Sequence, residues 1–178
     1  MTVAVSARRA GATSLLLALL AGASQGGAWC AVVGVPALSW AATADAGVDL
    51  ERLAVVPDPG PDGAAVAATL LDGFDLVAFA SQGSLAASVS SHLSARARTS
   101  KSVLVACTAG WPGANLSMSV EASSWHGRRR LRAHRMDVLV SGRGNAGRPR
   151  RAEVWLPADQ ALPVETASAA PRRLRVVS

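Results

Sequence analysis

The 178-residue sequence is poor in residues that build many redox and metal sites: it has no tyrosine, two cysteines and three histidines. Cys30 and Cys107 lie in apolar runs, without a C-x-x-C motif or a Cys/His cluster. This context predicts buried thiols in a reducing compartment and no metal site. The histidines are scattered, as is typical of surface residues: His92, His126 and His134.

Acidic residues are scarce in the second half of the chain. Residues 1–90 hold three arginines and seven acids, whereas residues 91–178 hold fifteen Arg or Lys residues and five acids. A basic half attracts nucleic acid or an acidic protein partner. A solvated basic face is the alternative that charge alone leaves open.

The amino terminus has the composition of a signal peptide. Arg8 and Arg9 precede an apolar run, 14–23, that is too short to span a membrane. Small residues follow, so a secreted protein cleaved near Gly22–Ala28 is one alternative. A buried helix has the same composition, and we favour the helix because of the pattern that follows.

Apolar runs without a polar face alternate with helical segments up to Cys107. Hydrophobic patterning predicts helices at Ser14–Ala23, Leu38–Ala46, Ala64–Leu71 and Ser84–Arg98. The strands predicted between them are Thr2–Ser6, Trp29–Val33, Leu53–Val56, Phe74–Ala80 and Ser102–Cys107. This alternation indicates an α/β fold with a largely parallel sheet flanked by helices.

The pattern changes after Trp111, where segments alternate in polarity between Gly- and Arg-rich turns. Leu116–Ser123, Leu131–Ser141 and Ala152–Leu156 are therefore predicted to be antiparallel strands added to the sheet. We expect one domain over residues 1–157. Residues 158–178, rich in Pro, Ala, Ser and Arg, are predicted to be a flexible basic tail.

The segment 6–13 lies between a strand and a helix, where a phosphate-binding P-loop would be. Aligned with G-x-x-x-x-G-K-[ST], Gly11 and Thr13 match the second glycine and the hydroxyl. Ser6 replaces the first glycine and Ala12 replaces the lysine that neutralises phosphate charge. Taken alone, this is a weak match to a degenerate P-loop.

The sequence downstream resembles the RecA family. The segments that carry the resemblance are Cys30–Val33, Gly47–Leu53, Phe74–Phe79, Arg135–Arg143 and Arg151–Leu156. The resemblance covers roughly residues 2–157 and implies a RecA-like core. It is loose between Leu85 and Arg132.

Two further positions depart from the RecA pattern. The glutamate that activates the attacking water falls at about Pro36, and the Mg²⁺-linked aspartate falls at Ala80. Asp75 begins its strand, so we expect it at the opposite end of the sheet. With the P-loop lysine also absent, we expect no ATPase activity, no catalytic residues and no cofactor. Nucleotide binding at Gly11 and Thr13 without hydrolysis is an alternative that the sequence leaves open. An active RecA-like ATPase in DNA recombination is the alternative.

A short, degenerate chain of this type is similar to the actinobacterial mutasome accessory proteins of the ImuA-prime type, which are RecA-like or SulA-like. The resemblance implies a non-catalytic adaptor in SOS mutagenesis and translesion synthesis. Its implied partners are an ImuB-like Y-family polymerase homologue, RecA and an error-prone replicative-type polymerase. It also implies a cytoplasmic, nucleoid-associated location, with no membrane contact.

The densest basic run is a candidate contact for DNA or a partner, although charges on an exposed strand edge also discourage aggregation. It comprises Arg128, Arg129, Arg130, Arg132 and Arg135. Trp111 and Trp125 flank turns in the same half. Such residues either cap a core or anchor an interface.

Overall fold

The computed structural model describes residues 1–7, 11–81, 83–108, 110–126, 133–142, 148–157 and 175–177. The α-helices are α1 (Ala12–Gln25), α2 (Trp40–Asp45), α3 (Gly63–Leu70) and α4 (Ala87–Thr99). The strands of the first part are β1 (Thr2–Ala7), β2 (Cys30–Val33), β3 (Leu53–Val56), β4 (Leu76–Phe79) and β5 (Val103–Ala106). The remaining strands are β6 (Leu116–His126), β7 (Ala133–Gly142), β8 (Arg150–Leu156) and β9 (Arg175–Val177).

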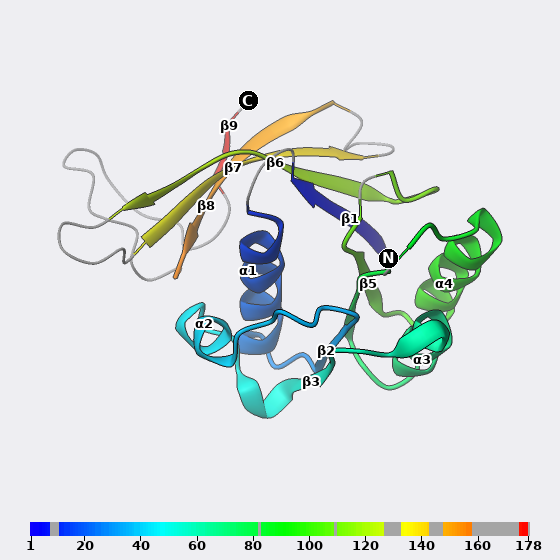
Figure 1. Cartoon of the computed structure of the whole chain (residues 1–178). Helices are drawn as coiled ribbons and strands as arrows, with labels where there is room; N and C mark the ends of the chain where they lie inside the picture. Colours follow the sequence, from blue (N-terminus) through cyan, green and yellow to red (C-terminus); the bar gives the residue numbers. More distant parts are fainter. Residues whose placement is uncertain are drawn as a thin grey trace.

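These strands form one sheet in the order β3-β2-β4-β5-β1-β6-β7-β8-β9. The first five in this order are mutually parallel. Helices α1 and α2 lie on one face of this half, and α3 and α4 lie on the other (Figure 1). The α/β class and the largely parallel sheet are therefore confirmed.

The inner parallel strands β2, β4 and β5 lack a polar face because both of their faces are buried. In β2, Cys30 and Val32 pack in the cluster beneath α1, whereas Ala31 and Val33 pack in the cluster beneath α3 and α4. All four residues of β2 are fully buried. A strand covered by helices on both sides needs this continuous apolar run.

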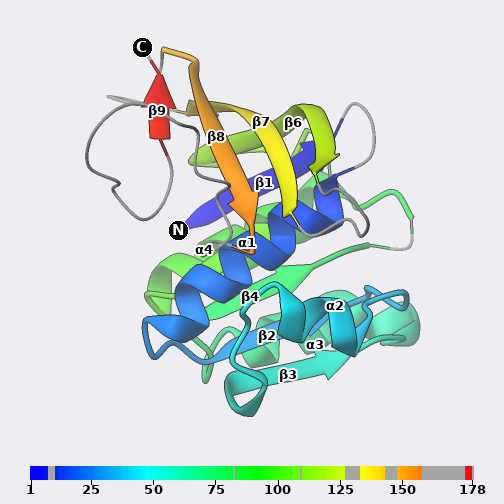
Figure 2. The same cartoon turned by 90° about the vertical axis from the view of Figure 1, so that its left-hand side faces the viewer.

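Helix α1 buries most of its leucine side chains against the sheet. Leu15, Leu16 and Leu20 are 2% exposed or less. The helix lies across the middle of the sheet, next to β8 as well as the parallel strands (Figure 2). Its signal-like composition is thus explained by its place in the core.

The antiparallel half differs from expectation at its first strand. β6 runs parallel to β1, with Val3 opposite Leu116 and Ala7 opposite Val120. β7 pairs antiparallel with β6, and β8 pairs antiparallel with β7. The polarity alternates in β6 because one face is exposed, and this feature alone does not report strand direction.

The sheet continues into the segment expected to be a flexible tail. Strand β9, Arg175–Val177, pairs antiparallel with β8, with Val176 opposite Ala152. Residues 158–174 lie outside the described part of the chain. No helix among the described residues is long and apolar enough to cross a membrane.

Candidate functional site

The candidate site is the carboxyl-terminal edge of the parallel strands, where β1 leads to α1. Gly11 caps the start of α1 with φ +130°, and its carbonyl accepts the Leu15 N–H at 2.9 Å. A Cβ at this position would lie 3.0 Å from Cγ1 of Val120. The strand–loop–helix arrangement predicted for residues 6–13 is present, and residues 8–10 lie outside the described part.

The first turn of α1 carries no charge. Ala12 occupies the lysine position and is half-buried, and Thr13 is exposed. Ser6 lies on β1 and is half-buried. The free N–H groups at a helix start favour anions, but here no side chain of the turn adds a positive charge that would hold a triphosphate.

The two acid positions of the RecA pattern lie at the same edge, after β2 and β4. Gly34 has φ +78° and donates its N–H to the Val56 carbonyl at 2.9 Å. A Cβ on Gly34 would overlap the carbonyl oxygen of Ala80. The chain at this point is held by backbone packing, while Pro36 is exposed and Ala80 is half-buried.

Asp75 lies at the opposite edge, as its place at the start of β4 predicted. Its Oδ2 accepts the Trp29 N–H at 2.9 Å, and the Trp29 carbonyl accepts the N–H groups of Asp75 and Leu76. The carboxylate thus aligns the starts of β2 and β4. It is separated by the length of the strands from Ala12, Pro36 and Ala80.

Two acids near the carboxyl-terminal edge were missed in the sequence. Glu121 lies in a β-bulge of β6, one residue beyond the pairing of Ala7 with Val120. Asp58 follows β3 at the outer end of the sheet, where its Oδ1 accepts the Gly60 N–H at 3.4 Å. Bulges occur often beside active sites, but the parallel direction of β6, which places Glu121 here, was not evident from the sequence.

Arg135 is the only described member of the predicted basic contact, since Arg128, Arg129, Arg130 and Arg132 lie outside the described residues. Its Nη2 donates to Asp137 Oδ1 at 3.0 Å and lies 2.8 Å from Glu153 Oε2. Trp155 Nε1 also donates to Glu153, at 2.6 Å. Two carboxylates therefore compensate the charge of Arg135 on the exposed face of β7.

Trp111 and Trp125, the two tryptophans that flank turns in the second half of the chain, have different environments. Trp111 is 6% exposed, donates to Ser94 Oγ at 2.9 Å and packs edge-on against Phe79. Trp125 is 57% exposed, and one face of its ring stacks on His134 at 4.2 Å. Trp111 thus caps the core beneath α4, whereas Trp125 leaves an aromatic surface open.

His134 is not the surface residue expected from the scattered histidines. It is 3% exposed, and neither ring nitrogen has a hydrogen-bond partner among the described residues. Burial lowers the pKa of His134 below its ordinary value of 6.5 because the charged imidazolium would lose its hydration. The period-2 pattern of β7 places it on the same face as the buried Met136 and Val138.

The cysteines are free thiols whose burial disfavours the thiolate. Burial raises the pKa of Cys30 to about 11 and the pKa of Cys107 to about 12. Neither thiol is therefore activated as a nucleophile at neutral pH. Within the residues that the structure describes, no group of three or more His, Cys, Asp or Glu side chains could hold a metal ion.

The sequence matches the model of the MT3502 N-terminal domain family over residues 1–113. An uncharacterized Mycobacterium tuberculosis protein, Rv3395c, is 36% identical over 116 residues. The alignment covers 65% of this chain and 57% of that relative, so the chain spans little more than half of the relative's length.

Two solved structures resemble the fold. SulA from Pseudomonas aeruginosa gives a TM-score of 0.52 at 19% identity, covering 60% of this chain and 96% of SulA. The flagellar accessory protein FlaH from Methanocaldococcus jannaschii gives 0.54 at 8% identity, covering 85% of this chain and 84% of FlaH. The fold is therefore RecA-like and SulA-like.

Proposed function

We propose that this chain, which belongs to the MT3502 N-terminal domain family, acts by binding other proteins and does not hydrolyse ATP. The observation that carries the proposal is the chemistry of one edge of the sheet. Three positions that bear charge in the RecA pattern are here Ala12, Pro36 and Ala80. They lie at the start of α1 and after β2 and β4.

Phosphoryl transfer depends on positioning and on charge stabilisation, because the protein contributes little covalent chemistry. Without the lysine, the phosphates lose their main neutralising contact. Without the two acids, no carboxylate activates the attacking water and none helps to hold the metal ion. The loss of one group can be compensated by a neighbour, whereas the loss of all three removes most of the catalytic contribution.

More specifically, we propose that the chain is an adaptor in DNA-damage-induced mutagenesis. The partners would be an ImuB-like Y-family polymerase homologue, RecA and an error-prone replicative-type polymerase, in the cytoplasm near the nucleoid. The resemblance of segments such as Gly47–Leu53 to the RecA family supports this role. The SulA-like fold is consistent with it, although a likeness of fold does not identify partners.

Secretion is disfavoured by the position of the first elements. Cleavage near Gly22–Ala28 would remove β1, which lies between β5 and β6, and most of α1. The core would lose Leu15 and Leu20, both at most 1% exposed. We therefore propose that the apolar run functions as a core helix.

The nucleotide test uses the purified chain and measures phosphate release from Mg²⁺-ATP. We expect no release above the buffer rate, and none after Ala12→Lys, because the two acid positions stay empty of carboxylates. ATP turnover by the wild-type chain would contradict the proposal. If Glu121→Gln abolished that turnover, the bulge carboxylate would be the catalytic base.

The partner test uses a deletion strain and measures mutation frequency after ultraviolet damage. We expect induced mutagenesis to fall and to return when the wild-type gene or the Ala12→Lys variant is supplied. The tagged chain should co-purify with the ImuB-like protein or with RecA from damaged cells. Unchanged mutagenesis together with recovery of neither protein would overturn the adaptor role.

A further inference from the structure

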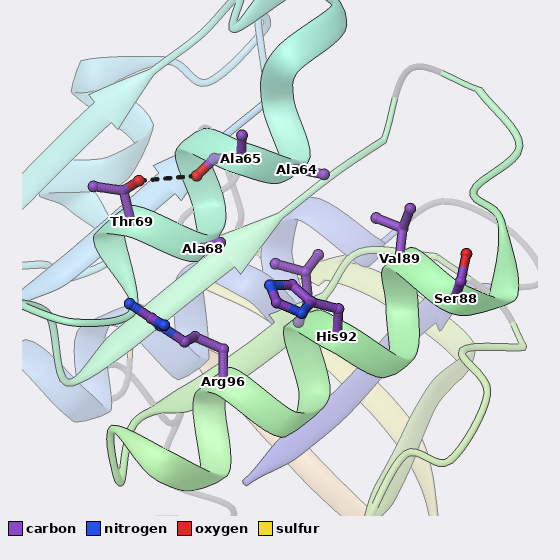
Figure 3. Close-up of a pocket in the computed structure, with 9 residues that line it drawn as sticks. Ala64, Ala65, Ala68, Thr69, Ser88, Val89, His92 and Arg96 are labelled. Carbon is purple, nitrogen blue, oxygen red and sulfur yellow. Dashed lines mark hydrogen bonds between the residues drawn. The ribbon is translucent and has the colours of Figure 1, made fainter.

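The proposed function leaves two features of the described chain unused, the α3–α4 groove and the buried His134. The groove has a volume of about 550 Å³ and lies between the two helices on the face of the sheet opposite α1 (Figure 3). Alanines such as Ala64 and Ala68 form its α3 wall, and Arg96 on its α4 wall is already paired with Asp72. Nothing among the described residues identifies an occupant for so apolar a groove, so we assign it no ligand. His134 has a more specific environment.

The end of the β6–β7 pair extends beyond the parallel part of the sheet. β6 pairs with β1 only as far as Val120 opposite Ala7, whereas its pairing with β7 continues to His126 opposite Ala133. In this end, β6 is therefore paired on one side, with β7. Fewer backbone hydrogen bonds hold it than hold a strand inside the sheet, so the end can open without unfolding the core.

His134 and Trp125 are stacked across this end. The two residues lie opposite one another in the β6–β7 pairing. Their ring centroids are 4.2 Å apart, and the ring planes are within 3° of parallel. On its other side His134 is opposite the buried Leu156 of β8. The neighbours of the imidazole in this row are thus an indole and a leucine, and neither offers an acceptor for an imidazole N–H.

Charged groups lie away from the face of the sheet that holds His134. Helix α1, which packs against this face, contains no charged residue. Glu121 is in the bulge of β6, four residues before Trp125. The other titratable side chains of these strand ends bind one another or Trp155 on the opposite face: His126 on β6, Arg135 and Asp137 on β7, and Glu153 on β8.

A proton on His134 is unfavourable while the rings are stacked. An imidazolium must donate two hydrogen bonds, and neither ring nitrogen has an acceptor among the described residues. The face of Trp125 attracts a cation, but this attraction is worth less than the lost hydration and the two missing hydrogen bonds. Burial accordingly lowers the pKa of His134.

We propose that His134 and Trp125 form a proton-sensitive latch at the end of the β6–β7 pair. While the imidazole is neutral, the stacked rings hold this end closed. Uptake of one proton moves the imidazolium out to water, parts the two strand ends and uncovers the stacked face of Trp125. Because tryptophan is a common anchor of protein interfaces, opening of the latch would make partner binding depend on pH. The latch itself requires no partner.

The direction of the pH dependence follows from the two protonation equilibria. In the open state the ring of His134 is solvated and takes up a proton near its ordinary pKa of 6.5, whereas in the closed state burial lowers the pKa. The closed state is therefore most stable above pH 6.5. Below pH 6.5, each pH unit raises the ratio of open to closed chains by about tenfold, until the lowered pKa is reached.

Native-state hydrogen exchange of the whole chain, followed by mass spectrometry between pH 7.5 and about 5.5, tests the latch. Exchange of an open amide is catalysed by hydroxide and slows about tenfold for each unit by which the pH falls. Opening of the latch increases by the same factor, so peptides containing residues 122–126 should exchange at a nearly constant rate below pH 6.5. In His134→Leu the same peptides should slow about tenfold per pH unit, because opening no longer takes up a proton.

The matched control is His126→Leu, which removes the other histidine of this end and should keep the constant rate. If circular dichroism shows that His134→Leu is unfolded, Trp125→Ala replaces it. With the indole gone, the pKa of His134 measured by NMR should return toward 6.5, and exchange should slow with falling pH.

Three results would overturn the latch. The first is a wild-type rate at residues 122–126 that falls about tenfold per pH unit. The second is a constant rate that is lost in His126→Leu. The third is exchange of β2 as fast as that of residues 122–126, because only unfolding of the whole domain would then expose His134.

Discussion

The parallel half of the sheet and its β6–β8 half bury their apolar residues differently. β2, β4 and β5 are covered by helices on both faces, whereas β6, β7 and β8 are covered by α1 on one face. The family match covers residues 1–113 and ends between β5 and β6. The shared domain is therefore the doubly covered half.

This difference separates two kinds of surface. The doubly covered half offers side chains only at strand ends and on the outer sides of its helices, which is where the P-loop position and the α3–α4 groove lie. The other half has a sheet face that no described helix covers, where Arg135, Asp137 and Glu153 are joined in ion pairs. Binding surfaces can thus change in the second half without disturbing the core.

The largest expected effect compares two leucines of these halves. Leu104 on β5 is fully buried between strands and helices, whereas Leu139 is half-buried, on the face of β7 that no described helix covers. Leu104→Ala should lower the free energy of unfolding by about 2–5 kcal/mol, because it leaves a cavity. Leu139→Ala should lower it by less than about 1 kcal/mol, and urea denaturation measures both. Equal losses would show that the outer face of β7 is covered as well.

A smaller effect tests the packing at the carboxyl-terminal edge. Gly34→Ala should cost roughly 2–4 kcal/mol, because alanine is strained at φ +78° and its Cβ meets the Ala80 carbonyl. The control, Gly73→Ala, has no heavy atom within 4 Å of the new Cβ and should change stability by less than about 0.5 kcal/mol. Thermal denaturation compares the two. A stable Gly34→Ala variant would mean that this edge has room for a larger side chain.

The smallest effect concerns His134 in the singly covered half. Its lowered pKa means that, as the pH falls below 6.5, the unfolded chain binds a proton before the folded chain does. The stability due to the neutral ring is therefore present above pH 6.5 and is lost as the pH falls toward the lowered value. His134→Phe should lose less stability than the wild type between pH 7.5 and about 5.5.

His92→Phe is the control for this measurement, because it removes an exposed imidazole instead of a buried one. Its pH dependence should follow that of the wild type. The measurement compares the denaturation midpoints of the wild type and the two variants at pH 7.5 and about pH 5.5. A His134→Phe variant with the wild-type slope would show that the imidazole gains a partner or water when it is protonated.

Sequence patterns were sufficient for most of the parallel strands with continuous apolar runs. β3 was predicted with its observed bounds, and β2 and β5 were predicted to within a residue at each end, because a continuous apolar run is distinctive. The position of Asp75 at the amino-terminal edge also followed from its place ahead of an apolar run. The P-loop position followed from the order of strand, loop and helix.

Features of the singly covered half were harder to predict from the sequence. Alternating polarity predicted that one face of β6 is exposed, but it contains no information about direction, so the pairing with β1 was missed. Glu121 was missed for the same reason. His134 looked like a surface residue because nothing near it in sequence reports that Trp125 covers its ring.

The sequence by itself determined the composition of each element and which residues are absent from the nucleotide position, since both depend on local order along the chain. The tertiary structure alone decided which elements meet. Long-range pairing placed β6 beside β1 and brought Glu121 next to the end of β1. It also set α3 beside α4 at the distance that leaves a groove between them. The packing of these two helices depends on side chains that lie about twenty residues or more apart in the sequence.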